Sequence, residues 1–157
     1  MNKIAQASAN MIEAGSDKAV GDVRRLEQAM RENLETIHLD THHIIHAGVY
    51  CRTIMIPEGG LVTGAQIKVD STVILSGDVT LYVNGAPRRF IGYHVLPAAA
   101  GRKQAAFAHL DTHVTMIYHT DAKTVSDIEE ECTDETELLM SRSSQANDTF
   151  LITRAEK

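Results

Sequence analysis

Short segments in which apolar and polar residues alternate, separated by tight turns, fill the middle of the chain and constrain its fold most. Residues 49–56 (VYCRTIMI) alternate in this way and end at Pro57. Residues 79–83 (VTLYV) lead into Asn84-Gly85, a dipeptide that favours a two-residue hairpin turn. Because side chains of a strand point alternately to its two faces, each segment can bury one face. The pattern predicts a small antiparallel sandwich or barrel.

Further strands are expected downstream of the first one, at residues 65–70, 71–78, 88–96, 104–110 and 113–120. The Pro and Gly residues between them predict turns at 57–60 and 76–78, a loop at 97–103 and a break at 111–112. In the last strand, alternation places Val114, Met116 and Tyr118 on the inward face and turns His113 and His119 outward.

Helical patterns flank this region. Residues 17–38 carry apolar side chains at steps of three or four, which form one stripe on a helix, and Ser16 or Asp17 can cap the first turn. Residues 2–14 predict a shorter helix. Residues 121–140 predict an acidic helix capped by Asp121 or Ser126, whose acidic run we expect to be a solvated face, with a docking surface for a basic partner as the alternative. Residues 149–157 have the pattern of a last strand or an arm.

The totals fit one domain and exclude some classes of function. The 157 residues divide into a helical segment at 1–40, a barrel at 41–120, and an acidic helix with a C-terminal arm at 121–157. A net charge of −6 disfavours nucleic-acid binding, and no stretch approaches the ~20 apolar residues of a membrane span. Cys51 and Cys132 lie far apart, which predicts a reduced intracellular protein. Cys51, in mid-strand, is expected to be buried and unreactive.

Residues 23 to 132 resemble the small cupins encoded by tailed bacteriophages. The family's Gly-hydrophobic-Tyr-x-Arg strand is matched at 48–52, its Pro-x-Gly turn at 57–59 and its Thr-Gly pair at 63–64. Its Ser-Gly-Asp turn, Pro-Ala-Gly-x-Lys loop and closing Asp-Thr stretch resemble residues 76–78, 97–103 and 111–120. The resemblance implies a mainly β fold: a single small jelly-roll barrel with one or two N-terminal helices and a C-terminal acidic helix or tail.

The metal ligands of the family are missing from this chain. Cupin enzymes hold a transition metal with a His-x-His pair and a carboxylate, plus one histidine from a later strand. Here residues 65–71 contain no histidine, and the later position offers Arg102, Lys103 and Gln104. Ile67 and Val69 would place hydrocarbon where the metal would sit. These departures predict a barrel without a metal or other cofactor, and leave only weaker metal candidates at His43, His46 and His119.

The function that these features favour is non-enzymatic. We expect a structural protein of a phage particle, a decoration, cement or adaptor component that oligomerises with itself and contacts other virion proteins. Its expected location is the host cytoplasm during assembly, and then the virion. The apolar helix stripe is predicted to form an interface or the lid of the barrel, through Val23, Leu26, Met30 and Leu34.

Two alternatives remain open. The first is a cupin-type small-molecule binder or enzyme that uses the mouth of the barrel, with a polar pocket drawn from Gln66, Lys68, Asp70, Arg89, His94 and His119. The second is an anti-defence or host-regulatory protein, with which the acidic charge and small size are compatible.

Overall fold

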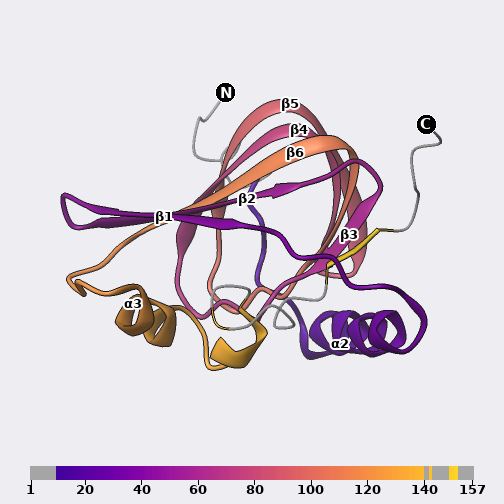
Figure 1. Cartoon of the computed structure of the whole chain (residues 1–157), viewed down its shortest axis with the longest axis horizontal. Coiled ribbons are helices and arrows are strands. Elements are labelled where there is room, and N and C mark those ends of the chain that lie inside the picture. Colours follow the sequence, from indigo (N-terminus) through magenta and orange to yellow (C-terminus); the bar gives the residue numbers. More distant parts are fainter. Residues whose placement is uncertain (1–9, 140–141, 143–148, 152–157) are drawn as a thin grey trace.

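The computed structural model describes residues 10–139, 142 and 149–151 and shows a mainly antiparallel β protein with two α-helices (Figure 1). The elements in chain order are α2 (Asp17–Asn33), β1 (Thr41–His46), β2 (Val49–Ile56), β3 (Gly60–Thr63), β4 (Ser71–Val83), β5 (Ala86–Ala98), β6 (Ala105–His119), α3 (Val125–Cys132), the 3₁₀ turn η1 (Thr136–Leu138) and β7 (Thr149–Leu151). The predicted mainly β fold, with a helix before it and an acidic helix after it, is confirmed. Neither helix of the described residues has the length and apolar composition of a membrane span.

β6 is the central strand of the sheet. One of its edges pairs with β4 along most of its length, and the other edge pairs first with β3 and then with β2. β5 extends the sheet from β4, β1 from β2, and β7 from β3. Because β6 has different partners along its two halves, the sheet curls toward a closed barrel. Figure 1 shows β4, β5 and β6 running together through one arch, with α2 and α3 below it.

The hairpin predicted at Asn84-Gly85 is confirmed. These two residues join β4 to β5 in the register Val83↔Ala86, and both have positive φ angles, +44° and +89°, as a type I′ turn requires. The side-chain oxygen of Asn84 also accepts a hydrogen bond of 2.9 Å from the backbone N–H of Ser16. The hairpin turn therefore holds the start of α2, where the Ser16 hydroxyl caps the helix by accepting from Ala19 N–H.

The predicted turn at 76–78 and the predicted break at 111–112 are wrong. β4 and β6 each continue through these positions, and their mutual register shifts there in a β-bulge. Gly77 has φ +149°, and a Cβ at this residue would lie 2.4 Å from the hydroxyl oxygen of Thr112. That hydroxyl accepts from Asp78 N–H at 3.1 Å and donates to Leu110 C=O at 2.8 Å. Gly77 and Asp78, which have the composition of a turn, thus form a bulge within the continuous strand β4, beside β6.

Three further expectations fail for backbone reasons. Residues 65–70 form a loop rather than a strand, because their amides bond to separate segments. Ile67 N–H donates to Arg102 C=O in the loop 99–104, and Lys68 N–H donates to Cys132 C=O at the end of α3. The first long helix ends at Asn33, with the next residue extended. Of the predicted helix 2–14, residues 2–9 lie outside the described residues; the remainder is not helical, and Ile12 bridges to Ala98 in parallel.

The predicted interface stripe on α2 is only partly exposed. Val23 and Met30 are buried against the chain itself, whereas Leu26 and Leu34 are each 37% exposed. Two of the four residues are therefore unavailable to a second molecule, and they hold α2 against the protein. The cap of the acidic helix also differs from expectation, because the hydroxyl of Thr124 accepts from Asp127 N–H.

We predict that adding even a methyl group at Gly77, in the bulge, destabilises the protein. Replacing Gly77 by Ala places a methyl group against Thr112 and forces a left-handed backbone on an L-residue, and we expect it to lower the free energy of unfolding by about 1–3 kcal/mol. In the matched control G21A, the new methyl has room within α2, so the helix should gain about 0.5–1 kcal/mol. Urea denaturation measures both, and an unchanged G77A midpoint would contradict the bulge.

Candidate functional site

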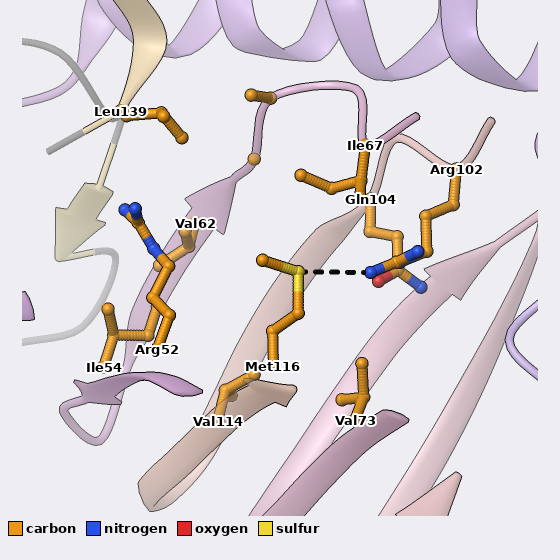
Figure 2. Close-up of a pocket in the computed structure, with 12 residues that line it drawn as sticks. Arg52, Ile54, Val62, Ile67, Val73, Arg102, Gln104, Val114, Met116 and Leu139 are labelled. Atoms are coloured by element: carbon orange, nitrogen blue, oxygen red, sulfur yellow. Dashed lines mark hydrogen bonds between the residues drawn. The ribbon is translucent and has the colours of Figure 1, made fainter. Parts of the chain in front are cut away.

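A cavity of about 160 Å³ lies between the central strands and the loops 64–70 and 99–104 (Figure 2). Its size is close to the ~150 Å³ at which an apolar protein cavity admits a benzene-sized molecule. Hydrocarbon makes up most of the wall, supplied by Ile54, Val62, Ala65, Ile67, Val73, Val114 and Leu139. The remaining side chains that line it are those of Arg52, Arg102, Gln104 and Met116.

Strand alternation explains how β2 and β6 contribute to this cavity. On β2 the inward residues are Tyr50 and Ile56, both 1% exposed, with Arg52 and Ile54 between them on the same face. On β6, Val114 and Met116 line the cavity and His113 and His119 face solvent, as the sequence pattern predicts. The cavity therefore lies on the concave side of the curled sheet.

Arg102 is a cation buried in this cavity wall. It is 3% exposed, and burial lowers the pKa of its guanidinium to about 10, so it stays charged at neutral pH. Its Nη1 donates to the backbone carbonyls of Val69 and Ala99, at 3.1 and 3.0 Å. Its Nη2 lies 3.3 Å from the sulfur of Met116, the contact drawn in Figure 2. Among the described residues, no carboxylate forms an ion pair with Arg102.

Gln104 lies beside Arg102 in the cavity wall (Figure 2). Its side-chain nitrogen Nε2 is buried and has no hydrogen-bond partner within the described part of the chain. A buried donor without an acceptor costs free energy on the order of 1–3 kcal/mol. Arg102 and Gln104 therefore present two nitrogen donors to a space that offers them only weak acceptors or none.

Arg52 faces the cavity from the opposite side and is paired differently (Figure 2). Its Nη1 lies 3.4 Å from Oε2 of Glu129, whose other oxygen accepts from Arg142 Nε at 3.1 Å. Glu129 is 3% exposed. The expectation of a solvated acidic face is therefore wrong at this residue, because α3 turns Glu129 toward the barrel and two guanidinium groups.

A second ion cluster, centred on Lys103, connects α2 with the loops that line the cavity. The ammonium of Lys103, whose side chain is fully buried, lies 2.9 Å from Oε2 of Glu27 on α2 and 3.4 Å from Oε2 of Glu135. It also donates to Gly64 C=O at 2.8 Å. Burial raises the pKa of the Glu135 carboxyl, but bonds from Gln66 N–H and Arg24 together with the charge of Lys103 outweigh burial, so this pKa lies below its usual value. Glu135 is thus a second acidic residue that is not solvated.

The residues predicted to form a polar pocket are not brought together. The Gln66 side chain contacts Arg24, and the Lys68 ammonium pairs with Asp134 on the surface. Asp70 accepts from Ala100 N–H. Arg89 and His94 lie on β5, in the arch. Arg89 forms a bidentate salt bridge with Asp78, and His94 bonds to Ile91 C=O. Neither these five residues nor His119, the sixth residue predicted for the pocket, lines the cavity, and their ligand binding stays a prediction.

The predicted metal candidates do not converge either. The ring of His43 stacks on Tyr50, with Nδ1 2.6 Å from the phenol oxygen. His46 is exposed at the end of β1, and His119 is exposed with Nε2 3.8 Å from Asp121. In the described residues, no three His, Cys, Asp or Glu side chains are grouped so that they could hold a metal ion.

The lining of the cavity does not fit the transition metal that a cupin barrel implies. Its polar groups are two guanidinium groups, a carboxamide and a thioether, whereas such metals are bound by imidazole, carboxylate or thiolate. Of the two residues predicted to place hydrocarbon at a metal position, Ile67 lines the cavity and Val69 does not.

The two cysteines differ in burial. Cys51, predicted to be buried, is half-buried on β2, and Cys132 at the end of α3 is buried beside Tyr118. Burial raises the pKa of the Cys132 thiol, so this thiol is neutral at physiological pH.

A second hollow, of about 360 Å³, lies where α2 crosses β3, β4 and β6. Its walls are apolar apart from Asp22, Thr80 and Tyr82, and none of the buried atoms without a partner in the described residues belongs to it. The cavity with Arg102 and Gln104 is therefore the stronger candidate site.

No family model and no curated protein matches this chain. Solved structures match part of it: a cupin superfamily protein from Desulfitobacterium hafniense, with 13% identity over 55% of this chain and 82% of that one, has a TM-score of 0.45. Ectoine synthase from P. lautus matches with 11% identity over 63% of this chain and 76% of that one, at a TM-score of 0.47. KdgF from Halomonas sp. matches with 13% identity over 54% of this chain and 81% of that one, at a TM-score of 0.45. None of these three is described as a phage protein.

The cluster around Lys103 should be essential for stability. Replacing Lys103 by Met removes the fully buried cation between Glu27 and Glu135 and leaves them their partly exposed arginine partners, Arg31 and Arg24. We expect a loss of about 3 kcal/mol in the free energy of unfolding, at the low end of the range for a broken buried ion pair. The control K18M removes an exposed lysine whose only described partner is Asp22, one turn along α2, and should leave the urea midpoint unchanged. A K103M midpoint equal to that of wild type would contradict this role.

The matched structures are similar to this chain in fold alone. The chain is a mainly β protein with a curled antiparallel sheet, similar to cupin jelly rolls over roughly half of its length.

Proposed function

We propose that this chain is a small-molecule binding protein whose ligand occupies the cavity lined by Arg102 and Gln104. One observation carries the proposal: apolar walls and two buried donors, one of them without a partner, surround a space of about 160 Å³. Pockets that bind small molecules have this composition, mostly apolar with a few polar groups that fix orientation. A purely structural barrel has no need of buried, unsatisfied donors.

The lining favours binding over catalysis. Among the described residues of the cavity wall there is no carboxylate, imidazole, thiol or hydroxyl side chain. General acid–base and nucleophilic catalysis need such groups within hydrogen-bond reach of the substrate. Of the hypotheses that the sequence left open, the binder at the barrel is therefore better supported than the structural protein of a phage particle, which remains a prediction.

Ligand entry can be tested by filling the cavity. Val114 is half-buried and lines the wall, so V114F places an aromatic ring in the space that a ligand needs. In methyl NMR spectra of the wild type, a set of small fragments should shift the signals of Ile54 and Ile67. We expect V114F, with an unchanged far-UV CD spectrum, to lose these shifts. If no fragment shifts the cavity methyls of the wild type, the proposal fails.

A second proposal is self-association through β5, and it keeps the oligomer expected from the sequence. Within the described strands, β5 pairs only with β4, so its other edge is open except near Ala98, where Ile12 bridges to it. Its outward side chains Ile91, Tyr93 and Val95 are 65%, 68% and 54% exposed. Exposed apolar edge strands add further strands, and two copies of one strand can pair antiparallel about a twofold axis.

Light scattering after size exclusion tests this association. We expect a species larger than the 17.2 kDa monomer for wild type and a monomer for I91K, because the new charge would lie in the contact. I44K makes the same change at an isoleucine that is 60% exposed on β1 and should retain the larger species. A monomeric wild type at every concentration would refute the association.

A further inference from the structure

We infer that the ligand of the cavity is a small aliphatic monocarboxylate, held by Arg102 and Gln104 with its hydrocarbon body against the apolar wall. The inference rests on the proposed function and assigns the chemical class of the ligand. It is argued from the charges that face the cavity, the donors that remain there, and the size of the space.

Arg102 forms no ion pair with a carboxylate of the described residues. Buried cations are almost always paired, because removing a charge from water is costly unless an opposite charge or strong acceptors replace the water. The described neighbours of Arg102 are backbone carbonyls and a thioether. The carboxylate of Asp70 accepts from Ala100 N–H; its charge raises the pKa of Arg102, but it forms no ion pair with the guanidinium. The buried thiol of Cys132 is neutral because its pKa is raised. An anion in the cavity would therefore meet a positive charge that the described residues compensate only in part.

The two donors match the two oxygens of one carboxylate. Among the described residues, the Nη2 of Arg102 has only the sulfur of Met116 as its acceptor, and a thioether is a weak acceptor. The Nε2 of Gln104 has none among the described residues. Figure 2 shows these two side chains next to each other on one side of the cavity. A carboxylate there would give each nitrogen a strong acceptor, and charge-assisted bonds of this kind are about twice as strong as neutral ones.

The opposite side of the cavity limits the ligand to one negative charge. Arg52 faces the cavity there, but the carboxylate of Glu129 already lies 3.4 Å from its Nη1. One buried cation without an ion-pair partner among the described residues suits a monocarboxylate better than a phosphate or a dicarboxylate, whose second charge would lie against hydrocarbon. The volume of about 160 Å³ suits a body of about four to six carbons.

Three probes with one carbon skeleton separate charge from shape: isovalerate, isovaleramide and 3-methylbutan-1-ol. Binding to the wild-type protein is measured by isothermal titration and by methyl NMR at constant ionic strength, with sodium chloride as the salt control. We expect isovalerate to bind at least about tenfold more tightly than either neutral probe, because only the carboxylate neutralises Arg102.

The Gln104→Leu variant tests the second donor without endangering the fold. It removes a buried nitrogen that has no partner, so the melting temperature should stay the same or rise. Its affinity for isovalerate should fall at least about fivefold, with a smaller change for the alcohol. The matched control Q28L alters an exposed glutamine on α2 that bonds to Glu32, and it should bind isovalerate like the wild type.

The possible failures are distinguishable. If the amide or the alcohol shifts the cavity methyls and binds as tightly as isovalerate, the carboxylate assignment is overturned while the proposed binding function stands. If Q104L binds isovalerate with wild-type affinity, the assignment is overturned as well. If neither these probes nor the wider fragment set shifts the cavity methyls, both the assignment and the binding function fall.

Discussion

The buried ammonium of Lys103 joins segments that are far apart in the sequence. It contacts Glu27 on α2, the backbone of Gly64 and the carboxylate of Glu135. An ammonium without water needs such partners, since an unpaired charge in the interior is strongly unfavourable. The contacts therefore fix the helix, the loop that carries Ile67 and the loop that carries Arg102 relative to one another. The cavity depends on this arrangement, because both loops supply its wall.

The cavity wall contains groups that oppose stability. Arg102 is buried without a described carboxylate partner, and Gln104 holds a donor that has no acceptor. Elsewhere the described chain neutralises its buried charges, as at Glu129 between two guanidinium groups. Local departures from the rules that stabilise a fold are concentrated at functional sites. The contrast between these two regions of one small protein is the main physical reason for placing a ligand in the cavity.

Much of the fold could be predicted from local patterns. Asn84-Gly85 forms the hairpin, Ser16 caps the first helix, and the inward faces of β2 and β6 follow their alternation. The failures arise where a local signal has two meanings. Ser76-Gly77-Asp78 has the composition of a turn, yet the chain uses the glycine for a bulge that bends a continuous strand. Only the partner strand, with Thr112 packed against Gly77, distinguishes the two.

The sequence by itself determined a mainly β protein with flanking helices, and it placed no imidazole at positions 67 and 102–104, because these properties depend on residues close together in the chain. Tertiary structure alone decided which polar residues are buried. Glu129 and Glu135 belong to one acidic run, but their partners come from β2, α2 and the loop of Lys103. In the same way, Arg102 and Gln104 become a paired set of donors only when the sheet curls around them. Burial of a polar group depends on segments distant in sequence, and no local pattern contains that information.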